Sequence, residues 1–167
     1  MPDELPHADL RAWAEGMYTA EAATELLIRA FDGTMADPSR PWIRTSNRGH
    51  WVDFDSIPDH LGALSGGEQR LLRIAASIGS SCAPAINLGD EISGLNRPTL
   101  RLVLAALAHA GGNHEHPDVI VDFNGQATII REPSLYPWPT SRYLELAPPL
   151  VPAADRRAMM PLLRRVE

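Results

Sequence analysis

The stretch Leu64-Ser65-Gly66-Gly67-Glu68-Gln69-Arg70 is the motif from which we interpret the rest of the chain, and an apolar helix follows it up to Ile78. Ser65 and Glu68 have capping-box spacing: the serine hydroxyl accepts a hydrogen bond from the N3 amide, and the glutamate accepts one from the cap amide. Leu64, just before the cap, is placed to contact apolar residues one turn later. The pattern predicts a helix that starts after Ser65 and buries one face, made of Leu71, Ile74, Ala75 and Ile78.

Length and composition indicate a single soluble domain. The chain has 167 residues, of which 44% are hydrophobic and 22% charged, ordinary values for a globular protein. No apolar run reaches the roughly 18 residues of a membrane span, and the acidic start Met1-Pro2-Asp3-Glu4 does not resemble a signal peptide. A lone cysteine, Cys82, excludes an internal disulfide. We therefore expect a cytoplasmic protein without membrane contact.

The charge balance restricts both chemistry and partners. The chain has 15 basic and 21 acidic residues, and its net charge of −6 opposes nonspecific binding to nucleic acid or anionic membranes. Every basic residue is an arginine. The absence of lysine excludes Schiff-base chemistry and the lysine that contacts the phosphates in a P-loop.

The N-terminal third predicts two helices followed by a hairpin. Apolar residues recur at spacings of three and four over residues 6–16, which is typical of an amphipathic helix. Thr19 is expected to cap a second helix, and Asp32-Gly33 to end it. Residues 42–54 contain two short alternating runs joined by Ser46-Asn47-Arg48-Gly49, which predicts a β-hairpin.

The segment after the central helix predicts two further helices. Asn87 is placed to cap a short helix, and Asn96 to cap a longer one that ends at Gly111-Gly112. We expect the buried face of the longer helix to consist of Leu100, Val103, Leu104 and Leu107.

A second hairpin and a proline-rich arm complete the chain. Asn124-Gly125 joins two β-rich runs over residues 119–131, which favours a tight type I′ turn. We expect an α+β fold in which both hairpins form one small antiparallel sheet packed against several helices. Residues 1–132 are assigned to this single domain. Residues 133–167 are expected to pack on it as a Pro-rich arm followed by a short terminal helix over residues 153–166.

The central segment resembles part of a known ATPase family. Leu64 to Arg70, then Asp90-Glu91, then Ser93-Gly94-Leu95-Asn96 are similar to the stretch from the signature motif to the D-loop of ABC-type ATPases. The resemblance implies that the signature serine and glycines would meet the γ-phosphate of ATP held by another subunit, and that the acid pair would serve Mg²⁺ and the attacking water. The binding residues under this interpretation are Ser65, Gly66, Gly67, Glu68, Arg70, Asp90 and Glu91.

The chain lacks the Walker A run Gly-x-x-x-x-Gly-Lys-[Ser/Thr] that holds the nucleotide. We therefore do not expect ATP hydrolysis by this chain alone, and a nucleotide- or phosphate-binding module would need a partner to complete it. Without that partner, the capping box is the preferred interpretation of Ser65 and Glu68.

A third interpretation is a helix-turn-helix. Residues 88–93, the turn Gly94-Leu95-Asn96 and residues 97–110 have its outline. The second helix offers only Arg97, Thr99 and Arg101 to a base edge, and the chain is acidic. A core helix is the preferred interpretation, so we do not expect nucleic-acid binding.

Candidate metal ligands cluster near one loop. His114, His116 and Asp118 follow one another closely, and His109 lies upstream. The spacing supplies no complete ligand set, even with Cys82 and the acid pair considered, so we expect a solvated loop, no metal site and no cofactor. Cys82 is expected to be a small buried thiol.

The whole chain is similar to small uncharacterised proteins of actinobacteria and their phages, a resemblance that implies no activity. We expect a non-enzymatic protein that acts through contacts with an unknown protein partner, a second copy included. Tyr136 and Trp138, in the proline-stiffened arm, are the predicted contact residues, because such side chains lose little entropy when they dock onto their own domain or another chain.

Overall fold

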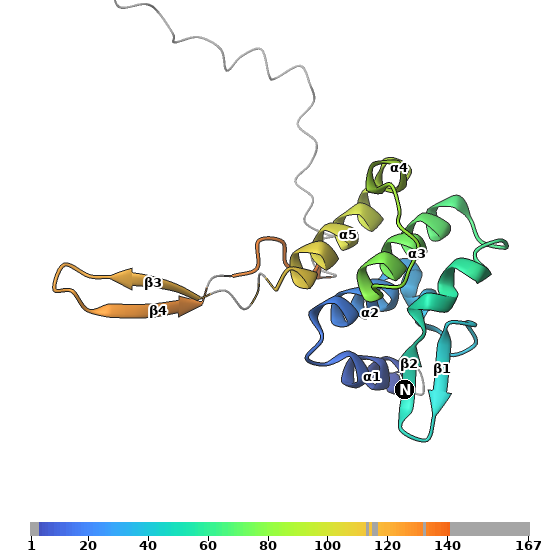
Figure 1. Ribbon diagram of the computed structural model, residues 1–167, viewed down its shortest axis with the longest axis horizontal. Coiled ribbons are helices and arrows are strands. Elements are labelled where there is room, and N and C mark those ends of the chain that lie inside the picture. Colours follow the sequence, from blue (N-terminus) through green and yellow to red (C-terminus); the bar gives the residue numbers. More distant parts are fainter. Residues whose placement is uncertain (1–3, 113, 115–116, 132, 141–167) are drawn as a thin grey trace, which may run out of the picture.

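The computed structural model describes residues 4–112, 114, 117–131 and 133–140 (Figure 1). This part of the chain is built from helices and two antiparallel hairpins, which confirms the predicted α+β class. Its elements are α1 (Glu4–Ala14), α2 (Tyr18–Arg29), the 3₁₀ segment η1 (Ala30–Ala36), β1 (Ile43–Ser46), β2 (Gly49–Val52), the 3₁₀ segment η2 (Phe54–His60), α3 (Gly66–Gly79), α4 (Leu88–Ser93), α5 (Arg97–Ala110), β3 (Pro117–Val121) and β4 (Ala127–Arg131).

The capping box at the start of α3 is confirmed. Ser65 has extended backbone, its hydroxyl accepts a hydrogen bond from the Glu68 amide at 3.4 Å, and the Glu68 carboxylate accepts one from the Ser65 amide at 2.8 Å. Two of the amides that a helix start leaves without intrahelical partners are thereby satisfied. The helix then buries one face, made of Leu71, Leu72, Ile74, Ala75 and Ala76.

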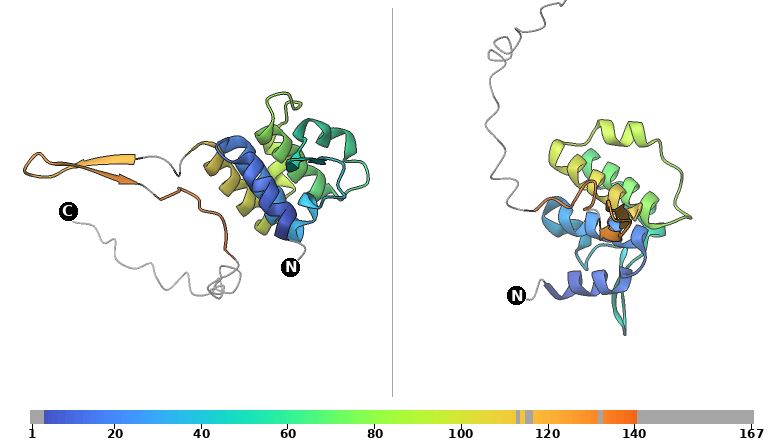
Figure 2. Two further views of the ribbon diagram at one scale, coloured as in Figure 1. Left: turned by 90° about the horizontal axis from the view of Figure 1, so that it is seen from below. Right: turned by 90° about the vertical axis from the view of Figure 1, so that its left-hand side faces the viewer.

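Helix α2 lies at the centre of the body and packs against α1, α3 and α5 (Figure 2). Its own buried face is rich in small and branched apolar residues. The core continues into the loop before β1, where Trp42 is almost fully buried and its indole donates a 2.8 Å hydrogen bond to the Met35 carbonyl. This layer of helices fixes the positions of the side chains at the ends of α2 and α5.

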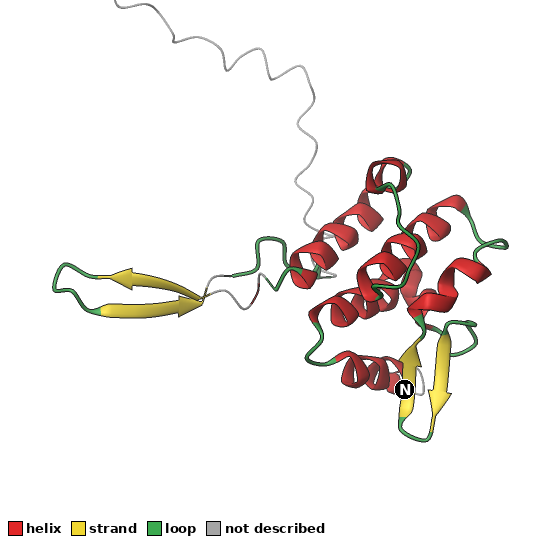
Figure 3. Ribbon diagram, viewed as in Figure 1, coloured by secondary structure: helices red, strands yellow, loops and turns green. Residues whose placement is uncertain are grey.

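The two hairpins form two separate sheets, which corrects the expectation of a single one. The β1–β2 hairpin packs against α1, whereas the β3–β4 hairpin extends away from the helices (Figure 3). The physical reason lies in the side chains. Ile43 and Val52, which pair across β1 and β2, are buried in the core, but every residue of β3 is exposed.

The turn between β3 and β4 is also different from the expected type I′ turn. Gly125 has φ +77°, but Asn124 does not adopt positive φ. The Gly125 amide bonds the Asp122 carbonyl, and the Asp122 carboxylate accepts hydrogen bonds from the amides of Asn124 and Gln126. This pattern is a type I turn followed by a left-handed glycine, because the Asp122 side chain stabilises the wider loop.

Four local predictions were wrong. Helix α2 ends at Arg29, before the expected stop at Asp32-Gly33. Met17, not Thr19, occupies the N-cap of α2. Leu104 and Leu107 are partly exposed, at 40% and 39%, because α5 turns its narrower Val103 face toward the core. Cys82 is exposed, since the loop after α3 runs over the surface.

Within the described residues, no helix is long and apolar enough to cross a membrane. The terminal helix expected over residues 153–166 lies outside the described residues.

Candidate functional site

The most unusual surface of the molecule is the β3–β4 hairpin, which projects from the end of α5 (Figure 1). Its apolar side chains are open to solvent: Val119 is 55% exposed, Val121 61% and Ile129 72%. Phe123, in the loop at the tip, is fully exposed. Exposed apolar residues gathered on one element mark interaction sites more often than scattered ones do.

The register places apolar residues on both faces of this hairpin. Val119 pairs with Ile129, and Val121 with Ala127, on one face. Ile120 and Ile130 lie on the other face, because side chains alternate along a strand. A sheet that covers a core has only one such face. The sequence pattern predicts these strands, but we expected them in the packed sheet, and the exposed surface was therefore not predicted.

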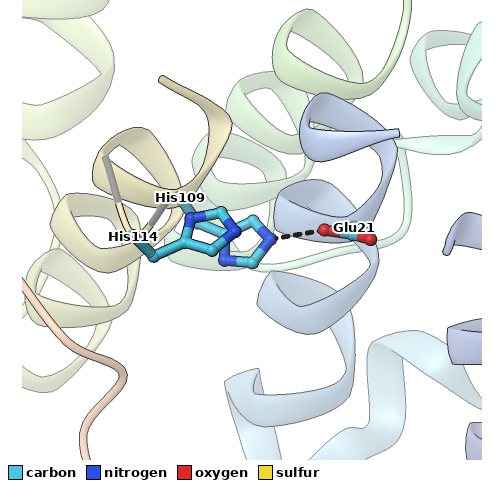
Figure 4. Close-up of side chains that lie close together, drawn as sticks. All are labelled: Glu21, His109 and His114. Carbon is cyan, nitrogen blue, oxygen red and sulfur yellow. Dashed lines mark hydrogen bonds and ion pairs between the residues drawn. The ribbon is translucent and has the colours of Figure 1, made fainter. Parts of the chain in front are cut away.

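A second cluster lies where the hairpin leaves the body. Glu21 in α2, His109 in the last turn of α5 and His114 bring one ligand atom each within 4.8 Å of one another (Figure 4). The Glu21 carboxylate and Nε2 of His109 form a 2.7 Å hydrogen bond, and the two imidazoles are stacked with ring centroids 4.1 Å apart. The fold thus brings together two histidines predicted as candidate ligands and a glutamate that was not.

The environment of Glu21 keeps its carboxylate ionised. Burial alone raises the pKa of Glu21, but hydrogen bonds from His109 and from the Gly16 amide, with the positive charge that the two histidines contribute, lower the pKa below its ordinary value. Tyr18 closes one side of the cluster, with its ring edge-on to both imidazoles. The arrangement gives an anionic oxygen beside two ring nitrogens, a donor set suited to a divalent metal.

Among the described residues, the other candidate metal ligands do not join this cluster. The Asp118 carboxylate accepts a hydrogen bond from the amide of Val119 on the exposed hairpin. Glu91 pairs with Arg73 at 2.8 Å. His116 lies outside the described residues. Glu21 was missed because it is 88 positions from His109 in the sequence and carries no spacing signal of its own.

Trp138 of the arm lies against its own domain. Trp138 is half-buried, with the Arg29 guanidinium 5.2 Å from its ring and the His109 ring centroid 6.2 Å away. Arg29 also donates a 3.3 Å hydrogen bond to the Pro139 carbonyl. Tyr136 is half-buried as well. The arm was predicted to dock either onto its own domain or onto another chain. The described contacts of Trp138 correspond to the first of these.

The signature-like residues lie at the surface near α4. Gly66 and Gly67 have open space around them, and the Arg70 guanidinium bonds the Asp90 carbonyl. Asp90 and Glu91 belong to the first turn of α4, where Arg73 holds Glu91. Ser65 and Glu68 are engaged in the capping box described above. Nucleotide binding by this group stays an alternative that these contacts do not test.

The predicted helix-turn-helix segment corresponds to α4 and α5. Asn96 caps α5 by accepting a hydrogen bond from the Thr99 amide at 2.9 Å. Thr99 is buried, so it is not available to a base edge. The face of α5 around Val103 packs against α2, as expected for a core helix. DNA binding by this segment likewise stays an untested alternative.

Comparison of the chain with protein-family models, with curated proteins and with solved structures finds no match.

Proposed function

We propose that the chain is a non-enzymatic cytoplasmic protein that acts through protein contacts, with the β3–β4 hairpin as its principal contact surface. The observation that carries this proposal is the exposure of apolar side chains on both faces of a projecting hairpin. Val119, Val121 and Ile129 make no packed core with the helices. Fully burying a Val or Ile side chain contributes about 1.5–3 kcal/mol, so several such residues can anchor a complex.

The backbone of the hairpin supports the same proposal. A two-stranded ribbon has two open edges, each with unpaired amide and carbonyl groups that can add to another sheet. A ribbon of this size is only marginally stable in water by itself. A partner that offers a strand edge can pair with the open edges of the ribbon, and one that offers an apolar groove can bury its exposed side chains. Either contact stabilises the ribbon. A second copy of this chain offers such an edge.

The test compares a tagged chain with two variants in its native host. Val119→Thr combined with Ile129→Thr keeps β-branched side chains but removes apolar surface from one hairpin face. Met17→Gln removes an exposed apolar side chain from the body and serves as the control. Partners, an untagged copy included, should be recovered with the wild type and the control but lost with the hairpin variant. Recovery of the same proteins by all three would contradict the proposal.

The two alternative functions are tested separately on the purified chain. A nucleotide-binding module should gain about 2.7 kcal/mol of stability at a hundred times the Kd of Mg²⁺-ATP, which raises the melting temperature. We expect no such shift. A DNA-binding protein should show a salt-dependent gel shift, and we expect none. A positive result in either assay would favour that alternative over the contact function.

A further inference from the structure

We propose that Glu21, His109 and His114 form a binding site for a divalent transition metal, with Zn²⁺ as the ion that best fits the donors. Two imidazoles and one carboxylate are a donor set that Zn²⁺ uses with its fourth position open to water or another ligand. The three residues come from α2, from the last turn of α5 and from the segment that leads into β3. The inference is independent of the contact function proposed for the hairpin.

The distances are close to those that a metal requires. Zn²⁺ binds histidine nitrogen and carboxylate oxygen at about 2.0–2.2 Å, so tetrahedral ligand atoms lie roughly 3.3 Å apart. Here the ligand atoms lie within 4.8 Å of one another, and the Glu21 oxygen is 2.7 Å from Nε2 of His109. The two imidazoles lie in nearly parallel planes, 12° apart, so at least one ring must rotate for both to point a nitrogen at the same ion. Figure 4 shows the stacked imidazoles beside the carboxylate.

A buried nitrogen gives independent support. Nδ1 of His114 is shielded from solvent and has no hydrogen-bond partner among the described residues. Such an atom is costly unless something binds it, because buried polar groups are normally satisfied. The His114 ring that carries this nitrogen is stacked on the His109 ring of the cluster. When a metal ion binds the cluster, a ring nitrogen of His114 serves as one of its ligands.

The surroundings orient the ligands and favour a cation. The second oxygen of Glu21 accepts a 2.7 Å hydrogen bond from the Gly16 amide, which fixes the carboxylate as an outer-shell partner does in metal sites. His109 lies at the C-terminal end of α5, where the helix dipole favours positive charge. The nearby Arg11 and Arg29 are both bonded to Glu25, so their charge is partly balanced locally.

An ion can reach the cluster from a neighbouring cavity. This cavity, of about 310 Å³, lies between α1 and α2 and is lined by Glu21, His109 and Thr24 among others. It exceeds the volume of several water molecules, so it accommodates a water as the fourth ligand.

The test titrates ZnCl₂ into the full chain after treatment with a chelator, by calorimetry and by thermal unfolding. We expect one Zn²⁺ per chain and a higher melting temperature. His109→Ala, His114→Ala and Glu21→Gln should each weaken binding by at least about tenfold, since even outer-shell changes cost 10–100-fold. His60→Ala, which removes an exposed histidine elsewhere, should bind like the wild type. Co²⁺ should give the visible spectrum of tetrahedral nitrogen and oxygen ligation in the wild type and in His60→Ala, but not in the three ligand variants.

Two outcomes would overturn the site. One is that the wild-type chain binds no Zn²⁺. The other is that His114→Ala and Glu21→Gln bind as tightly as the wild type, which would place the metal elsewhere. Circular dichroism of each metal-free variant identifies any that fails to fold. Glu21→Gln keeps a hydrogen-bond acceptor for His109, and His114 comes after the end of α5. These two variants therefore decide the matter if His109→Ala unfolds.

Discussion

Glu25 accepts a 2.7 Å hydrogen bond from Nε of Arg29, one turn later on α2, while its other oxygen bonds Arg11 of α1. The Arg29 guanidinium in turn lies over the ring of Trp138. One partly buried carboxylate therefore connects α1, α2 and the C-terminal arm. The contacts explain why the arm lies against its own domain.

Replacement of Glu25 tests this connection. Glu25→Gln keeps the shape of the side chain but removes the charge that both arginines bond. We expect the free energy of unfolding at neutral pH to fall by about 1–2 kcal/mol, since hydrogen bonds to charged groups are stronger than neutral ones. Urea titration of both proteins measures the difference. Asp59→Asn, at an exposed acidic residue, is the control and should change little.

The same carboxylate predicts a pH dependence. Burial alone raises the pKa of Glu25, but hydrogen bonds from Arg11 and Arg29 outweigh it and hold the pKa below its ordinary value of 4.5. A lowered folded-state pKa contributes stability that is present above about pH 4.5 and is lost as the pH falls through the folded value. The stabilities of wild type and Glu25→Gln should therefore converge in acid. A gap that persists unchanged into acid would contradict this assignment.

The capping box at α3 predicts a separate loss. Ser65→Ala removes the acceptor for the Glu68 amide and should lower the free energy of unfolding by about 1 kcal/mol. Ser81→Ala, at an exposed serine of the next loop, is the matched control. Thermal unfolding distinguishes the two. Equal effects of both changes would mean that the cap contributes nothing.

Replacement of Gly112 by alanine should lower the free energy of unfolding for two reasons. It has φ +67°, and a Cβ atom there would lie 3.0 Å from the Tyr18 ring. Gly16 has a similar φ of +85° but open space around it. Gly16→Ala should cost about 1 kcal/mol for the left-handed backbone alone, and Gly112→Ala should cost clearly more. Equal losses in a denaturant titration would show that the Tyr18 contact adds no strain.

Local sequence signals predicted much of this fold. The capping box at Ser65, the caps at Asn87 and Asn96 and both hairpins depend on residues a few positions apart, so the sequence shows them directly. Asp122 is a counterexample, because its side chain selected a wider turn than Asn124-Gly125 alone suggested.

Features that depend on distant residues could not be predicted in this way. Whether the β3–β4 hairpin packs or projects depends on which helices lie near it, and an apolar strand has the same pattern in both cases. The contact of Glu21 with His109 joins residues 88 positions apart. The exposure of Leu104 depends on which face of α5 meets α2. Each is a consequence of tertiary packing.

The contact function is tested most directly by a photo-crosslinking amino acid placed at position 129 of the chain in its native host, with position 59 as the exposed control. The account predicts that position 129 forms a defined covalent product with one protein, a second copy of the chain included. It also predicts that this product is absent at position 59 and is lost when Val119→Thr is added. The absence of any product specific to position 129 would contradict the claim that the hairpin is the contact surface.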